Sequence, residues 1–199
     1  MRKIVVNIRG TNGSGKSTLV RKLLARKGKK ALRNKNGKIW AYRLRGTKSR
    51  VYVLGPYKPD TGGGCDHLCS VKINEGMKTF DFICKAIRRL NKKGSVIFEG
   101  AIISTVAGRW ADLAHDLRPT RFIFAEMDTP LKKCIKRVVR RRKEKGNDKE
   151  FDPEKSMTGK FRAVQSSGEM LRMGGMDVRS LPHKKGVKTI LHWLGEKNE

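Results

Sequence analysis

Apolar and polar residues follow two different patterns along the chain. Short continuous apolar runs occur at residues 4–8, 95–98, 121–127 and 178–181. Apolar residues spaced three or four positions apart occur at residues 18–24, 75–90, 110–117, 131–142, 155–173 and 187–194. The short runs are typical of buried strands and the wider spacing is typical of helices. Because strands that alternate with helices form parallel sheets, the sequence predicts an α/β fold with a parallel sheet flanked by helices.

Two segments depart from this alternation. Residues 38–44 and 50–54 are rich in β-forming side chains and are separated by a short polar loop, which predicts a hairpin in a basic insertion at about residues 28–58. Residues 143–154 are charged, contain Gly, Asp and Pro and lack apolar periodicity, which predicts a mobile loop between two helices. We expect a lid there, at about residues 142–156. All 199 residues fit a single domain that carries both segments.

The most specific chemical motif lies between the first apolar run and the first helix. Residues 10–17, Gly-Thr-Asn-Gly-Ser-Gly-Lys-Ser, match the pattern G-x-x-x-x-G-K-[ST] at every position. In this motif glycines let backbone N–H groups surround a phosphate, the lysine reaches the β and γ phosphates, and the hydroxyl residue holds Mg²⁺. We therefore expect a nucleoside triphosphate and Mg²⁺ as ligands, with Lys16 on the phosphates and Ser17 on the metal. The nucleotide-binding residues expected from the motif are Gly10, Thr11, Asn12, Gly13, Ser14, Gly15, Lys16, Ser17 and Thr18.

Charge is the second strong signal in the sequence. The chain has 47 Lys and Arg against 18 Asp and Glu, a net charge of +29, and its first acidic residue is Asp60. Such an excess favours a polyanionic partner, and we expect nucleic acid. A role in solubility alone is the weaker alternative, because solvated surfaces usually mix both signs. In the basic segment at residues 21–50, Trp40 and Tyr42 are candidates for stacking on bases, although aromatic residues at alternate strand positions are more often core.

Two acidic residues are candidates for the chemistry of the site. Glu99 ends a buried apolar run, and open α/β sheets bind ligands at the carboxyl ends of their strands. We expect Glu99 to hold Mg²⁺, directly or through water, or to accept a proton from an attacking hydroxyl. The structural alternative is that Glu99 pairs with Arg109 or caps the next helix. Asp66 follows glycines at residues 62–64 that allow a substrate to approach closely, and Asp60 lies in the same loop. The sequence leaves open whether Glu99 or Asp66 is the base.

Arginines gather on the helix expected at residues 131–142. Arg137 and Arg141 lie one helical turn apart and lead into the expected lid, where guanidinium groups can neutralise the charge that develops on a transferring phosphoryl group. We assign these two to phosphate, and Arg140 and Arg142 to the DNA backbone. A solvated basic helix face is the competing explanation.

Other kinds of site have weaker support. Cys65, His67 and Cys69 supply only three soft ligands, too few for a zinc site, and His183 and His192 are expected to be surface or edge residues. Four cysteines are also too few for a disulfide scaffold. The sequence has no apolar stretch of signal-peptide or membrane-spanning type, so we expect a cytoplasmic protein without a membrane partner. The oligomeric state does not follow from the sequence.

The order of these motifs resembles the P-loop nucleoside and nucleotide kinase superfamily over nearly the whole chain. Residues 128–131, Asp-Thr-Pro-Leu, followed by Arg137 and Arg141, are similar to the segment that enters the lid in that superfamily. The resemblance implies that the adenine rests near the loop at residues 182–186. Residues 99–100, Glu-Gly, stand where thymidylate kinases carry an Asp-Arg pair, which argues against a free nucleoside monophosphate as the acceptor.

A narrower resemblance is to the phage kinases that phosphorylate 5-hydroxymethyluracil bases within DNA during thymidine hypermodification. It is carried by residues 10–17, 62–66 and 98–100 and by the unusual net charge. It implies an ATP-dependent phosphotransferase that acts on the 5-hydroxymethyl group in bacteriophage DNA, in the host cytoplasm. A 5'-hydroxyl polynucleotide kinase and a nucleoside or nucleotide kinase are the enzymatic alternatives, and a nucleotide-gated nucleic-acid-binding protein is the non-enzymatic one.

Overall fold

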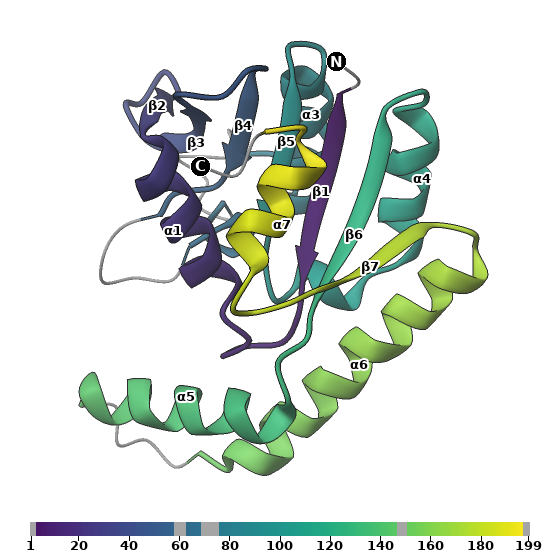
Figure 1. Cartoon of the computed structure of the whole chain (residues 1–199). Coiled ribbons are helices and arrows are strands. Elements are labelled where there is room, and N and C mark those ends of the chain that lie inside the picture. The colour runs from purple at the N-terminus through teal and green to yellow at the C-terminus, as the bar shows by residue number, and fades with distance from the viewer. Residues whose placement is uncertain (1–2, 58–62, 69–75, 147–150, 197–199) are drawn as a thin grey trace.

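The computed structural model describes residues 3–57, 63–68, 76–146 and 151–196. Within them lies one seven-stranded sheet with the strand order β2-β3-β4-β5-β1-β6-β7 (Figure 1). The strands are β1 (Ile4–Arg9), β2 (Lys29–Arg33), β3 (Ile39–Leu44), β4 (Val51–Leu54), β5 (Ser95–Glu99), β6 (Arg121–Met127) and β7 (Asp177–Leu181). Strands β4, β5, β1, β6 and β7 are parallel, whereas β2 and β3 run antiparallel at one edge. The predicted α/β fold with a parallel sheet is confirmed.

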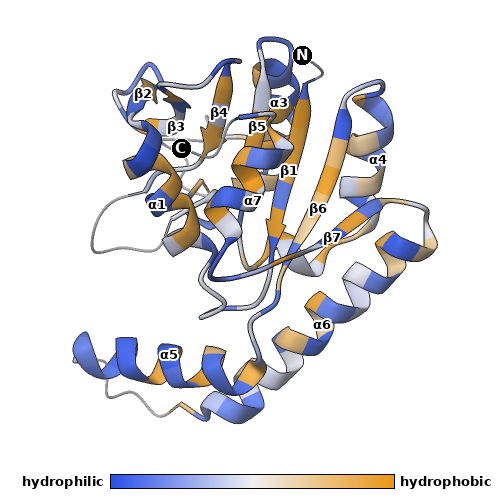
Figure 2. Cartoon of the chain, in the orientation of Figure 1, coloured by the Kyte–Doolittle hydropathy of each residue, from blue (hydrophilic) through white to orange (hydrophobic). Residues whose placement is uncertain are grey.

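Helices cover both faces of the sheet. They are α1 (Lys16–Lys27), α3 (Thr79–Asn91), α4 (Gly108–Asp116), α5 (Leu131–Glu144), α6 (Pro153–Met173) and α7 (Gly186–Trp193), with the short 3₁₀ helices η1 (Cys65–His67) and η2 (Ile103–Thr105). Buried residues of α1 and α7 pack on one face, and those of α3, α4 and the end of α6 pack on the other. The central strands are largely apolar, shown in orange in Figure 2, because both of their faces are covered. None of the described helices has the length and apolar character needed to cross a membrane.

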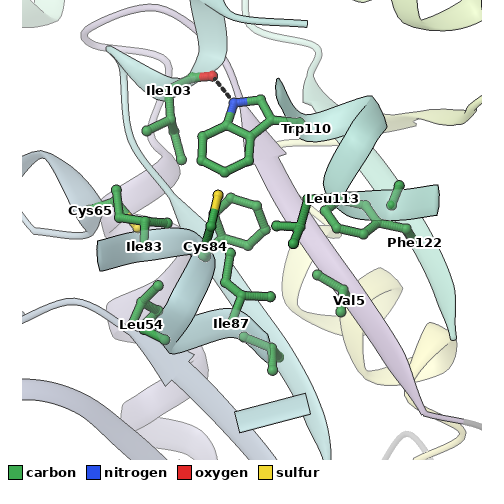
Figure 3. Close-up of a cluster of buried hydrophobic side chains, with 14 of the residues drawn as sticks. Val5, Leu54, Cys65, Ile83, Cys84, Ile87, Ile103, Trp110, Leu113 and Phe122 are labelled. Atoms are coloured by element: carbon green, nitrogen blue, oxygen red, sulfur yellow. Dashed lines mark hydrogen bonds between the residues drawn. The ribbon is translucent and has the colours of Figure 1, made fainter. Parts of the chain in front are cut away.

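The core under α3 and α4 fixes the turn that follows β5 (Figure 3). Trp110 is fully buried, and its ring centroid lies 5.4 Å from that of Phe98, the residue before Glu99. The indole Nε1 donates a hydrogen bond of 2.8 Å to the carbonyl oxygen of Ile103. Packing therefore holds the chain on both sides of residues 100–102.

The basic insertion extends the sheet. Strands β3 and β4 form the predicted hairpin, but β2, which the sequence pattern did not indicate, pairs with β3 at the edge. The turn between β2 and β3 is set by Asn34, whose side-chain oxygen accepts hydrogen bonds of 3.0 Å from the backbone N–H groups of Asn36 and Lys38. Because β4 pairs in parallel with β5, the insertion is continuous with the sheet instead of forming a separate hairpin.

The aromatic side chains of this insertion belong to the core. Tyr42 and Tyr52 are each only 5% exposed. Trp40 is partly buried against the core, and the Arg89 guanidinium lies 5.8 Å from its ring centroid. The hypothesis that Trp40 and Tyr42 stack on bases is therefore wrong for Tyr42, and Trp40 already packs against the core and Arg89. Aromatic residues on a strand face that helices cover pack inward.

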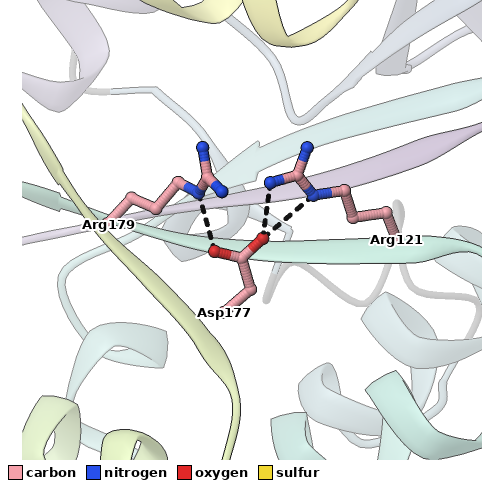
Figure 4. A network of polar contacts seen from close by, with 3 residues as sticks. All are labelled: Arg121, Asp177 and Arg179. Atoms are coloured by element: carbon pink, nitrogen blue, oxygen red, sulfur yellow. Dashed lines mark hydrogen bonds and ion pairs between the residues drawn. The ribbon is translucent and has the colours of Figure 1, made fainter.

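Strand β7 is fastened to the sheet by a polar network (Figure 4). Asp177 pairs with Arg121 of β6 through Oδ2 at 2.8 Å and with Arg179 of its own strand through Oδ1 at 2.7 Å. Both arginines share one carboxylate, and such a network holds geometry better than an isolated surface pair. The network lies at the first residues of β6 and β7, at the opposite end of β7 from the loop that follows it.

The predicted lid segment is shorter than the sequence indicated. Helix α5 continues to Glu144 and α6 begins at Pro153, so the loop predicted for residues 143–154 is wrong at both ends. Helix α6 begins there because the Asp152 side chain accepts a hydrogen bond of 2.9 Å from the backbone N–H of Lys155. Residues 147–150 of the predicted lid lie outside the described residues.

Helix α5 and the first turns of α6 form an arm that stands apart from the sheet (Figure 1). We use this name for residues 131–146 and 151–163. The arm has a small core of its own, formed by Cys134, Val138 and Met157. Most of α5 is hydrophilic, shown in blue in Figure 2, because only one narrow face packs against α6.

Candidate active site

The phosphate loop connects β1 with α1 at the carboxyl edge of the sheet. Gly13 and Gly15 have φ angles of 76° and 101°, which residues with side chains rarely adopt. A Cβ atom on Gly13 would also overlap the backbone carbonyl of Cys134 in α5. The Lys16 ammonium donates a hydrogen bond of 2.7 Å to the carbonyl oxygen of Gly10. The phosphate loop is therefore shaped by its glycines and by the Lys16 hydrogen bond, and it packs directly against α5 of the arm.

Glu99 lies at the end of β5, next to the phosphate loop. Its side chain is buried, and its Oε1 accepts a hydrogen bond of 2.9 Å from the Ser17 hydroxyl. Burial raises the pKa of Glu99 to about 7, although the nearby Lys16 ammonium and the Ser17 hydrogen bond favour the charged form. The alternative pairing with Arg109 does not occur, because Arg109 pairs with Asp81 at 2.7 Å. A carboxyl group that titrates near neutral pH beside a phosphate-binding lysine is suited to accept a proton.

Asp66 lies in η1 and faces the turn that follows β5. Its Oδ2 accepts a hydrogen bond of 2.7 Å from the backbone N–H of Ala101, and its Oδ1 accepts one of 3.2 Å from that of Ile102. Both carboxylate oxygens therefore hold backbone groups. Asp66 and Glu99 line the same cleft. Asp60, the other acidic residue of the loop, lies outside the described residues.

This cleft has a volume of about 940 Å³ and lies between the phosphate loop and the arm. Asp66, Glu99 and Glu144 are its acidic residues. Its lysines and arginines are Lys16, Arg21, Arg137, Arg140, Arg141, Arg142 and Lys145. The four arginines of α5, which the sequence divides between two predicted roles, thus line one cleft. Arg137 contacts the phosphate loop directly, because its Nη1 donates a hydrogen bond of 3.1 Å to the carbonyl oxygen of Gly13.

Arg140 and Arg142 also make contacts within the arm. Arg140 pairs with Glu144 at 3.3 Å, and the Arg142 guanidinium lies 4.4 Å from the ring centroid of Phe151. The division of the four arginines between phosphate and the DNA backbone therefore stays a prediction.

His183 is a site residue that the sequence did not indicate. It follows β7, and its Nε2 lies 2.8 Å from Nη2 of Arg137. A neutral imidazole accepts a hydrogen bond from a guanidinium, and burial together with the Arg137 charge lowers the pKa of His183. The ring also lies against Gly15, since a Cβ atom there would stand 2.8 Å from His183 Cε1. His183 is partly buried and directly follows the edge strand β7, and its place in the loop at residues 182–186 was the available signal for its part in the site.

Arg9 is a second residue that the sequence did not indicate. It ends β1 immediately before the phosphate loop, and it is fully buried. Its Nη2 donates hydrogen bonds of 2.6 Å to the Ser104 carbonyl and to the Ser167 hydroxyl, and Nη1 donates one of 3.3 Å to the Val106 carbonyl. Burial lowers the pKa of the guanidinium to about 10. Arg9 therefore joins β1, the turn after β5 and helix α6.

The donor atoms of the cleft suit a hard cation. The Ser17 hydroxyl and the Glu99 carboxylate oxygen lie together beside the phosphate loop, and Mg²⁺ prefers such oxygens in combination with substrate phosphates. Within the described ranges, no three His, Cys, Asp or Glu side chains are grouped so that they could hold a metal ion by themselves. A metal at this site would accordingly depend on phosphate oxygens.

Comparison with known proteins gives consistent matches. A family model described as 5-hmdU DNA kinase matches residues 2–172. The chain is 33% identical over 182 residues to the 5-hmdU DNA kinase of Pseudomonas phage PaMx11, covering 87% of this chain and 88% of that protein. It is 27% identical over 198 residues to the 5-hmdU DNA kinase of Pseudomonas phage M6, covering 96% and 98%.

Among solved structures, a chain of the Pnkp1/Rnl/Hen1 RNA repair complex has a similar fold. The TM-score is 0.54 at 15% identity, and the match covers 85% of this chain and 46% of the other. At this level of identity the likeness concerns the fold alone.

Proposed function

Because the chain belongs to the 5-hmdU DNA kinase family, we propose that it transfers the γ-phosphoryl group of ATP to the 5-hydroxymethyl group of a uracil base within DNA. The observation that carries this proposal is the buried Glu99 carboxyl group, which meets Ser17 of the phosphate loop at the end of β5. This contact supports the proposal that Glu99 accepts the proton beside the position expected for the γ-phosphate. In this proposal all 199 residues form one kinase domain, and the arm carries the lid.

The nucleotide phosphates are held by the loop at residues 10–18. Backbone N–H groups and the start of α1 surround the phosphates, and Lys16 adds a point charge. Ser17, with Glu99 through a water molecule, would hold Mg²⁺, which neutralises charge on the β and γ phosphates. The adenine is expected near the loop at residues 182–186, where the His183 ring packs against Gly15.

Glu99 is the proposed base. As the hydroxymethyl oxygen forms its bond to the γ-phosphorus, the bond from phosphorus to the bridging oxygen breaks and ADP leaves. The hydroxyl proton passes to Glu99, whose pKa of about 7 suits that task. Asp66 is less suited, because its two oxygens hold the backbone N–H groups of Ala101 and Ile102. We assign Asp66 a positioning role.

Arg137 and Arg141 complete the proposed site. They line the cleft from the arm, opposite Glu99. Charge spreads over the oxygens of the transferring phosphoryl group in the transition state, and guanidinium groups held in place stabilise it. Arg137 is already held by Gly13 and His183, so little reorganisation is needed.

The DNA partner is supported by the net charge of +29. Lysine and arginine side chains of the arm line the catalytic cleft. A second hollow, of about 540 Å³, is lined by Lys30, Arg43, Arg45, Lys48 and Arg50. The second hollow lies at the start of β4, at the opposite edge of the sheet from the phosphate loop. We propose that the arm holds the DNA around the reacting base. Because a stacked base cannot bring its hydroxymethyl group to a buried carboxylate, the base must leave the helix or be presented on a single strand.

The proposal is tested by transfer of labelled γ-phosphate to closed circular DNA. Circles that contain 5-hydroxymethyluracil should be labelled, unmodified circles should not, and Lys16→Ala should abolish the label. Label on linear 5'-hydroxyl ends but not on modified circles would assign a polynucleotide kinase instead. Nucleotide-dependent DNA binding without any transfer would assign a nucleotide-gated binding protein.

A further inference from the structure

Ile102 is an exposed aliphatic residue three positions beyond Glu99. Ile102 is 62% exposed. Among the described residues, the other exposed large hydrophobic residues are Val139, Met170 and Met173. Isolated exposed aliphatic side chains are ordinary on protein surfaces. Ile102 differs from the other three because it lies in the turn that follows Glu99 and because the Asp66 carboxylate holds its backbone N–H.

The backbone on both sides of Ile102 is fixed by hydrogen bonds. The Asp66 carboxylate accepts bonds from the N–H groups of Ala101 and Ile102, at 2.7 and 3.2 Å. The Ser104 hydroxyl donates a bond of 2.5 Å to the Gly100 carbonyl. The same hydroxyl accepts a bond of 3.1 Å from Gly10 N, so the turn is tied to the phosphate loop.

Neighbouring residues anchor the turn in the core. Ile103 is only 2% exposed, and its carbonyl oxygen accepts the Trp110 hydrogen bond shown in Figure 3. Ala101, on the other side, lines the cleft together with Glu99. Ile102 is thus held between a residue of the cleft wall and a residue of the core, and its exposure does not arise from a loose loop.

When the substrate is duplex DNA, the geometry of the site requires the modified base to leave the stack. Glu99 is 1% exposed at the end of β5, so a hydroxymethyl group reaches it only when the base enters the cleft. Extrusion leaves a gap between the neighbouring base pairs, and proteins that unstack bases fill such gaps with apolar side chains. Three peptide units span at most about 11 Å, so Glu99 and Ile102 can act on the same nucleotide.

We propose that Ile102 is the wedge that enters the duplex and occupies the space left by the extruded 5-hydroxymethyluracil. The inference rests on the proposed function and goes beyond it. It names duplex DNA as a substrate, and it names Ile102 as the residue that determines specificity for the duplex. Asp66 then has a defined role: it holds the wedge at a fixed distance from Glu99. Ile102 touches no reacting atom and is not a catalytic residue.

The test compares one 5-hydroxymethyluracil oligonucleotide as a single strand and as a duplex. Ile102→Ala should lower kcat/KM for the duplex on the order of tenfold or more, since about three buried carbon atoms are removed, and should leave the single strand within about twofold. Ile102→Leu should retain most of the duplex activity. Met173→Ala, at an 89% exposed position near the end of α6, is the matched control and should change neither value. The fluorescence of 2-aminopurine placed next to the modified base should rise on binding of the native protein and rise less with Ile102→Ala.

Equal losses on duplex and single strand, or no loss on the duplex, would overturn the wedge assignment while leaving the kinase activity established. If the native protein phosphorylates neither substrate, the proposed function itself fails, and the wedge assignment fails with it. Equal thermal unfolding midpoints of the native and variant proteins will show that the fold is unchanged.

Discussion

At the scale of single residues, burial decides which groups can act. Glu99 shares its pocket with Lys16, and the removal of water raises its pKa to about 7 despite that lysine. The sequence could predict Lys16 and Glu99, because a motif and a strand end mark them. It could not predict His183 or Arg9, because their roles come from neighbours that are distant in sequence, such as Arg137 and Ser167.

The identity of the base can be tested by pH dependence. Glu99 must be deprotonated to accept a proton, so kcat/KM of the native protein should rise with pH through about 7 and level off above it. Glu99→Gln should lose roughly 10²-fold or more in rate, and the inflection should disappear. Asp66→Asn is the matched control and should keep the inflection near pH 7. An inflection that survives in Glu99→Gln and vanishes in Asp66→Asn would reverse the two roles.

His183 should affect phosphoryl transfer through Arg137. Removing the imidazole deprives the guanidinium of its 2.8 Å partner, and a hydrogen bond to a charged group is worth about 1.5–3 kcal/mol. Because Arg137 is assigned to the transition state, His183→Ala should lower kcat by roughly tenfold or more, with a smaller change in KM for ATP. His192→Ala, at an exposed position on α7, should leave both constants unchanged. Steady-state kinetics with ATP varied will show whether the two variants differ as expected.

At the scale of elements, hydrophobic periodicity located the buried strands and most helices. It missed β2, because this edge strand has no fully buried residue and therefore no alternation to detect. It also misplaced the start of α6. The pair Asp152-Pro153 is a helix-start signal, but the surrounding charges suggested a loop. At edge strands and helix ends, strand pairing and helix capping determine the structure more than burial does, so hydrophobic periodicity does not detect these elements.

Two glycines of α6 should respond differently to alanine. Nothing lies within 4 Å of a Cβ atom on Gly159, so Gly159→Ala should stabilise the protein by about 0.5–1 kcal/mol through helix propensity. A Cβ atom on Gly168 would meet the Glu126 carboxylate, which pairs with Arg172. Gly168→Ala should therefore gain none of this stability, or lose some. Urea unfolding of both variants measures the difference, and equal stabilisation would contradict the packing of α6 on β6.

At the scale of the whole molecule, the net charge indicates which class of partner binds, and the fold determines over which surfaces the DNA runs. The net charge of +29 predicts a nucleic acid as the partner, and the sequence assigns contacts with it both to the basic segment at residues 21–50 and to Arg140 and Arg142. In the structure, the hollow lined by residues 43–50 and the catalytic cleft lie at opposite edges of the sheet. Strand β1 alone separates these edges by about 20 Å. Such a separation cannot be read from composition.

The path of the DNA can be tested by salt dependence. Removing one cation that neutralises a DNA phosphate should reduce the slope of log affinity against log salt by about 0.9. For a short duplex centred on the modified base, Lys132/Lys136/Lys143→Gln on α5 should reduce the slope by roughly 2–3. Arg45/Lys48/Arg50→Gln removes the same charge at the far edge and should change the slope little. The opposite result would place the DNA on the insertion instead of the arm.

The position of the transferred phosphate tests the central claim most directly. Closed circular DNA containing 5-hydroxymethyluracil is treated with γ-labelled ATP, freed of unincorporated nucleotides, digested to nucleoside monophosphates without phosphatase, and analysed by mass spectrometry. We expect the label on a nucleotide whose 5-hydroxymethyl group carries one phosphate in addition to its sugar phosphate, and none after treatment with the Glu99→Gln protein in the same time. Label found only on a sugar hydroxyl, or on free nucleotides, would contradict the assignment of the internal base as the acceptor.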